Sequence, residues 1–161
     1  MKKLSKLLVI TAALTVIGAV PAMAQEVTDP ATIVTEAQLI KTLNDHQAVV
    51  AGQVQALANT MADKNAANQQ IALVMSQVQT YNKNEANNYI NYLKKAIINL
   101  EETERIKKEV VDNYTNLAKA NPQYAAMIPQ AISEYNAAVA ATAQWRANLN
   151  KAVADFAVMY R

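Results

Sequence analysis

The chain of 161 residues has no cysteine, one histidine, two glycines and four prolines. Without cysteine it can form no disulfide, thiolate zinc site or covalent haem attachment. The low glycine and proline counts exclude collagen-like and glycine- or proline-rich disordered chains. Gly52 is the only glycine after residue 24, so the glycine-rich phosphate loops and the G-x-S-x-G elbow are excluded as well. The length fits one domain.

Groups suited to catalysis are equally scarce. With His46 as the single histidine, neither a two-histidine metal site nor an H-E-x-x-H motif can be built. The acidic residues over 101–112 alternate with Arg105, Lys107 and Lys108, which is typical of a solvated helix face with i,i+4 ion pairs such as Glu101–Arg105. We therefore predict no catalytic residue, no metal site and no cofactor, and a protein that is not an enzyme.

Residues 1–24 carry the pattern of a secretory signal peptide. A positive segment of three lysines precedes an apolar run over 7–20, and the small residues Ala22 and Ala24 form an A-x-A cleavage pattern before Gln25. A membrane-spanning helix needs about 20 apolar residues, so the run is too short for an anchor. The sequence predicts export to the periplasm, exterior or surface of a bacterium, with no integral membrane span after cleavage.

Removal of residues 1–24 changes the net charge. The full chain has a net charge of +2, but the signal segment holds three lysines and no acid, so the remaining 137 residues carry 12 basic and 13 acidic side chains, net −1. A nucleic-acid-binding protein needs a concentrated positive face. We therefore expect no nucleic acid among the partners.

The pattern after residue 24 is helical. Apolar residues recur at spacings of three and four, and the cap signals are Asp29 with Pro30 at one start and Asn82 with Glu85 at another. The step over 63–65 is left open as a loop or a kinked helix. Residues 122–128 are expected to form a short helical turn. The pattern predicts helices over about 30–81, 85–119 and 130–160.

These elements predict an all-α fold. Three helices with short connections favour an elongated antiparallel bundle or coiled coil in a single domain over 25–161, and a turn at 63–65 would make a four-helix bundle the alternative. On the last helix, the expected apolar seam is Ile132, Tyr135, Val139, Leu149, Val153, Phe156 and Tyr160. Thr142 lies in the same seam, where its hydroxyl can bond back to a carbonyl of the preceding turn.

A partner surface is the only candidate site. Tyrosine and asparagine suit recognition surfaces and are concentrated over 81–92, although core packing of the tyrosines is the competing interpretation. Arg146, which follows Trp145, has three interpretations: it extends to solvent, pairs with an acid of a facing helix, or fixes register and oligomeric state. The candidate residues are Tyr81, Asn84, Asn88, Tyr92, Trp145 and Arg146.

The predicted function is binding or assembly by an exported, non-enzymatic helical protein, through a protein partner or self-association. In outline the layout is similar to small components of the bacterial cell envelope, surface or secretion apparatus. The alternative is a carrier that holds a small ligand or cofactor in a bundle core, for example a haem with His46 and a methionine such as Met61 or Met75 as axial ligands.

Overall fold

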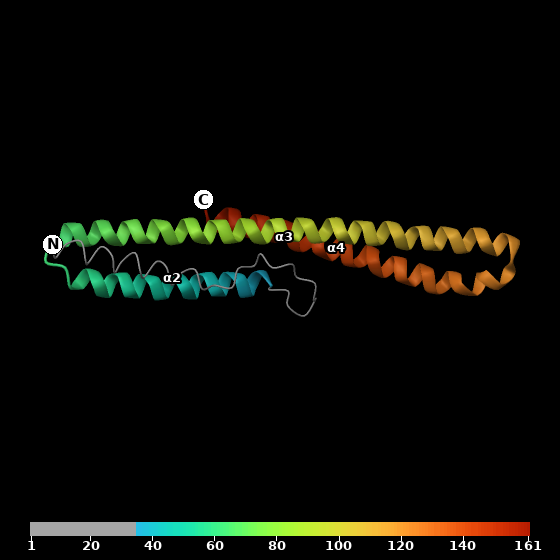
Figure 1. The fold of residues 1–161 in the computed structure, drawn as a ribbon, viewed down its shortest axis with the longest axis horizontal. Coiled ribbons are helices and arrows are strands. Elements are labelled where there is room, and N and C mark those ends of the chain that lie inside the picture. Colours follow the sequence, from blue (N-terminus) through green and yellow to red (C-terminus); the bar gives the residue numbers. More distant parts are fainter. Residues whose placement is uncertain (1–34) are drawn as a thin grey trace, which may run out of the picture. The chain divides into compact units, whose positions relative to one another are not determined.

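The computed structural model describes residues 35–161. The predicted signal peptide and the predicted cap at Asp29 and Pro30 lie outside this part of the chain. Residues 35–161 form three long helices and no strand, as an all-α helical bundle (Figure 1), which confirms the predicted fold class. The elements are α2 (Glu36–Asn59), α3 (Lys64–Ala120), the 3₁₀ helix η3 (Pro122–Met127) and α4 (Ile128–Met159).

Helix α2 begins with a capping box that the sequence analysis missed. The hydroxyl of Thr35 accepts a hydrogen bond from the backbone N–H of Gln38 at 3.2 Å, and the Thr35 N–H donates to the Gln38 side chain at 2.8 Å. Two otherwise unpaired donors at the helix start are satisfied in this way.

The predicted helix over 30–81 is wrong in its extent, because the chain turns at residues 60–63. Asp63 precedes α3, and its Oδ1 accepts hydrogen bonds from the backbone N–H groups of Asn65 at 2.9 Å and Ala66 at 3.2 Å. An aspartate in this capping position stabilises a helix by about 1 kcal/mol. The step over 63–65, which the sequence left open, is therefore the start of a new helix.

The predicted break at Asn82–Glu85 is also wrong, because α3 continues through it to Ala120. Asn82 is buried, with 1% of its surface exposed, and its Nδ2 donates to Oε1 of Gln47 on α2 at 3.2 Å. An asparagine inside a helix costs less than about 1 kcal/mol. Its amide is used across the helix pair here, so it does not cap a new helix.

The described residues divide into two compact units, of which the first extends to Tyr89 and also includes Tyr160. In this unit α2 and the first part of α3 are antiparallel neighbours joined by the turn at 60–63 (Figure 1). Val50 and Val54 of α2 form a buried cluster with Val74 and Val78 of α3. Burying a valine side chain contributes about 1.5–3 kcal/mol, so this cluster is a main source of the unit's stability.

The second unit covers Ile90–Met159 and Arg161. It pairs the rest of α3 with α4, joined through η3, which confirms the expected helical turn after Asn121. The rings of Tyr114 and Tyr124 stack at 6.5 Å between centroids near this connection. The prediction of a single domain over 25–161 stays a prediction.

The buried line of α4 agrees with the predicted seam at Thr142 and Phe156 and differs from it at three large apolar residues. Ala131, Thr142, Ala152 and Phe156 are its buried residues. The hydroxyl of Thr142 donates to the carbonyl of Ala138 at 3.0 Å, as predicted. Alanine at two of the buried positions, 131 and 152, permits close helix approach. The predicted seam residues Ile132, Val139 and Val153 are 41%, 36% and 44% exposed.

Candidate protein-binding surface

The six candidate surface residues are divided between the two units. Tyr81, Asn84 and Asn88 belong to the first unit, and Tyr92, Trp145 and Arg146 belong to the second. Tyr81 packs against the valine cluster, and its ring lies 5.8 Å from that of His46 in an edge-on contact. Burial, with a smaller effect from the charge of Glu85, raises the pKa of Tyr81. Tyr81 is therefore a packing residue.

Asn84 and Asn88 lie on the exposed surface of α3. The side-chain amide of Asn88 donates to Oε1 of Glu85 at 3.3 Å, a contact within one helix turn. Both amides are accessible to water, so Asn84 and Asn88 stay candidates for a partner surface. Neither contributes to the buried polar contact at Asn82.

A polar contact joins α2 and α3 in the first unit. Asn82 donates to Gln47, while Oδ1 of Asn82 and Nδ1 of His46 are buried without a hydrogen-bond partner among the described residues. An unsatisfied buried polar atom costs about 1–3 kcal/mol. Sequence reasoning missed this contact because it assigned Asn82 to a helix cap. The sequence did hold one signal for these residues: their spacing places His46 on the apolar seam of α2 and Asn82 on that of α3.

Tyr92 and Trp145 lie together in the second unit, one on α3 and the other on α4. Their ring centroids are 6.1 Å apart and the planes are tilted by 59°. Both residues are half-buried, and burial raises the pKa of Tyr92. Aromatic pairs in this geometry add about 0.5–1.5 kcal/mol beyond burial. Tyr92 and Trp145 thus help to hold α4 on α3.

Arg146 pairs with an acid of the facing helix, which was the second of its three interpretations. Its Nη2 lies 2.6 Å from Oε1 of Glu101 on α3. The hydrogen bond and charge of Glu101 raise the pKa of Arg146. Both side chains are half-exposed, with 59% and 44% of their surfaces accessible, so salt screens the attraction. The pair removes the net charge from this part of α4.

The other charges within α4 are paired too. Glu134 accepts from Lys107 of α3 at 2.5 Å, and this bond lowers the pKa of Glu134. Lys151 and Asp155 form an i,i+4 pair at 2.6 Å. With Arg146, these are all the charged residues of Ile128–Met159. Each has its opposite charge within the same unit, so α4 presents no net charge to a partner.

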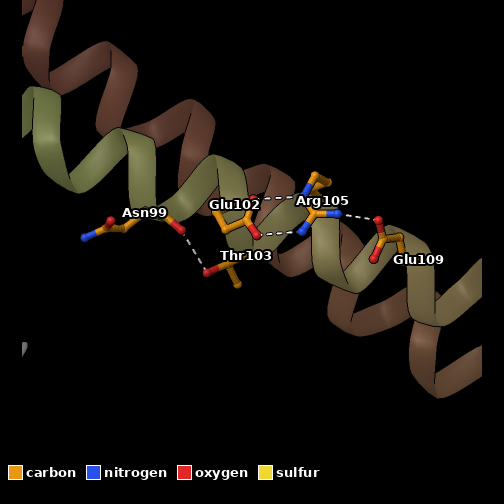
Figure 2. Close-up of polar contacts among 5 residues, drawn as sticks. All are labelled: Asn99, Glu102, Thr103, Arg105 and Glu109. Atoms are coloured by element: carbon orange, nitrogen blue, oxygen red, sulfur yellow. Dashed lines mark hydrogen bonds and ion pairs between the residues drawn. The ribbon is translucent and has the colours of Figure 1, made fainter.

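In the acidic stretch of α3, Arg105 forms its ion pairs within its own helix. Figure 2 shows Arg105 between two carboxylates of its own helix: it bonds to Glu102 with its Nη2 at 2.6 Å from Oε1, and its Nη1 contacts Glu109. The predicted Glu101–Arg105 pair is not formed, because Glu101 bonds to Arg146. The hydrogen bond from Arg105 lowers the pKa of Glu102. This part of α3 is a charged, solvated face.

One exposed side of α4 carries large apolar residues, amides and a single charge, that of Arg146, which is paired. Ile132, Val139, Arg146 and Val153 follow one another at intervals of seven residues, and all four are exposed, with Arg146 paired to Glu101. Beside this line, Asn136, Ala143 and Asn150 form a second exposed line with the same spacing. We call these two lines together the outer α4 face.

Comparison with protein-family models, with curated proteins and with solved structures finds no match for the chain. The helices of residues 35–161 do not reach the combination of length and apolarity that crossing a membrane requires. In the same residues, no three histidine, cysteine, aspartate or glutamate side chains gather into a group able to hold a metal ion.

Proposed function

We propose that the protein is an exported, non-enzymatic helical protein that acts by protein–protein binding through the outer α4 face. The observation that carries the proposal is the exposure of Ile132, Val139 and Val153 on a helix whose charges are all paired within the unit. Apolar surface gains free energy when a partner removes it from water, at about 25 cal/mol per Å². Depletion of free charge at the centre of a contact is typical of interfaces.

Export supports this function by placing the protein where envelope and surface assemblies form. The basic, apolar and small-residue pattern over 1–24 directs the chain to the secretory route. A chain without cysteine folds there without oxidation. We propose the periplasm or the cell surface of a bacterium as its location, with an envelope or secretion assembly as the setting.

The variant Val139→Lys tests the binding function. Because Val139 is exposed, we expect the variant to fold as stably as the original chain, within about 0.5 kcal/mol. A lysine there must lose its hydration when a partner covers it, so the protein should leave its high-mass complex. Native electrophoresis of the envelope fraction shows whether the protein is in the complex. N-terminal sequencing of the same sample should give Gln25 as the first residue.

Asn148→Lys is the matched control, because it adds the same charge to an exposed residue of α4 outside the outer face. It should leave the complex intact. If both variants remain in the complex, or if the original chain enters none, the proposal is wrong.

The carrier function remains the alternative from the sequence. A carrier encloses its ligand in a largely apolar cavity. In the first unit, the space between α2 and α3 holds the valine cluster and the ring contact of His46 with Tyr81. Native mass spectrometry separates the two functions, because a carrier purified under mild conditions retains a bound mass and an absorption spectrum reveals a haem.

A further inference from the structure

The outer α4 face reads nearly the same in both chain directions. Taking Ala143 as the centre, Asn136 and Asn150 stand seven residues away on either side. On the neighbouring line Ile132 and Val153 are the two ends, and their midpoint falls within one residue of Ala143. A two-fold symmetric contact needs a patch that is complementary to itself, and this order places apolar residues opposite apolar residues and amides opposite amides, with Val139 opposite Arg146 as the one unlike pair.

We propose that this face binds a second copy of the chain, with the two α4 helices antiparallel and Ala143 on the two-fold axis. The inference rests on the proposed binding function and names its partner. In an antiparallel pair, each of the two residue lines of the face lies opposite the same line of the second copy. Ile132 then lies beside Val153 of the second copy, and the central Ala143 residues meet each other.

The polar residues of the face fit the same arrangement. Asn136 faces Asn150 of the second copy, and two side-chain amides can donate to and accept from one another. Val139 lies beside Arg146 of the second copy, whose aliphatic stem can cover it while its guanidinium stays with Glu101. Alanines at 140, 143 and 147 allow the helices to approach closely.

Electrostatics also favour a copy of this chain over a charged partner. A face with net charge would repel its own copy, but the one charge on this face, that of Arg146, is neutralised by Glu101 at 2.6 Å. A strongly acidic or basic partner would find no opposite charge here to pair with. Two neutral, self-complementary faces associate without charge repulsion and without leaving a partner's charge unpaired.

Single-cysteine variants test the pairing directly, because the native chain contains no cysteine to interfere. In the purified full chain, Ala143→Cys should form a covalent dimer under oxidation or with a short thiol crosslinker. Asn136→Cys alone and Asn150→Cys alone should crosslink at least about tenfold less, whereas a mixture of the two should crosslink efficiently. Asn148→Cys, outside the face, is the control and should remain monomeric.

Three results would overturn the antiparallel self-pairing. Strong crosslinking of Asn136→Cys to itself would show that the two copies pair in parallel. In a second result, Ala143→Cys stays monomeric while Val139→Lys still leaves the native complex. The face would then bind a different protein: the binding function stands, but the partner is not a second copy. A monomer that also enters no complex in the envelope would overturn both proposals.

Discussion

Asn82→Asp is expected to destabilise the first unit by about 3 kcal/mol at neutral pH. Asn82 is buried with 1% of its surface exposed, so the substitution places a charge in the contact between α2 and α3. Its Nδ2, which donates to Gln47, becomes an oxygen. Gln47 can rotate its amide and donate one hydrogen bond, but this does not replace the lost hydration of a full charge.

The loss should depend on pH with a definite sign. Burial raises the pKa of the introduced carboxyl in the folded state above the value of about 3.9 for an unfolded aspartate. The folded state therefore binds the proton more tightly. The destabilisation is complete above the folded pKa, shrinks as the pH falls through it, and loses its electrostatic part below about 3.9.

Urea unfolding of Asn82→Asp at several pH values measures this effect, and Asn84→Asp is the matched control. Asn84 lies two residues further along α3 and is exposed, so the same chemical change there should alter the free energy of unfolding by less than about 0.5 kcal/mol. Equal effects of the two variants would mean that Asn82 is not buried against α2 and that α3 ends near it, as the sequence analysis expected.

Leu43→Ala is expected to cost about 2–5 kcal/mol of unfolding free energy. Leu43 on α2 has 0% of its surface exposed, so its truncation loses apolar burial and leaves a cavity. Leu73 on α3 carries the same side chain in the same unit but is 53% exposed. Leu73→Ala should therefore change the stability by less than about 0.5 kcal/mol.

Chemical denaturation of the two leucine variants side by side checks the orientation of both helices in the first unit. A small loss for Leu43→Ala together with a large loss for Leu73→Ala would reverse the assignment of buried and exposed faces. The comparison does not depend on the absolute stability of the chain, because both variants remove the same atoms.

The helical class follows from the sequence because it depends on local signals. These signals are the apolar spacings of three and four, the small number of helix breakers and the connection at Asn121-Pro122, and all of them are visible in the sequence alone. The back-bond of Thr142 to Ala138 was predictable for the same reason. It involves one turn of one helix and needs no knowledge of the neighbours.

The helix boundaries at 60–63 and 82–85 required tertiary information. Asp63 and Asn82 are both good capping residues, and only the packing separates them. Asp63 caps α3, while Asn82 meets Gln47 across the helix pair. Local sequence treats the two residues alike, so the prediction placed the break at the wrong one.

The contacts of α4 were only partly predictable. A pair between Arg146 and an acid of a facing helix was one of three interpretations, and the structure shows this pair. That partner, Glu101, was assigned to Arg105 because i,i+4 pairs within one helix are the only ones visible in a sequence. Ile132 and Val139 were assigned to the core because they are large and apolar, whereas two alanines, Thr142 and Phe156 occupy the buried line of α4.

The central claim is that the outer α4 face is covered by protein in the cell. The most direct test places a photo-crosslinking amino acid at Val139 in one variant and at Asn148 in another, and irradiates cells that produce each. We predict a covalent adduct of discrete mass from position 139 and none from position 148. No adduct from position 139, or equal adducts from both positions, would contradict the claim.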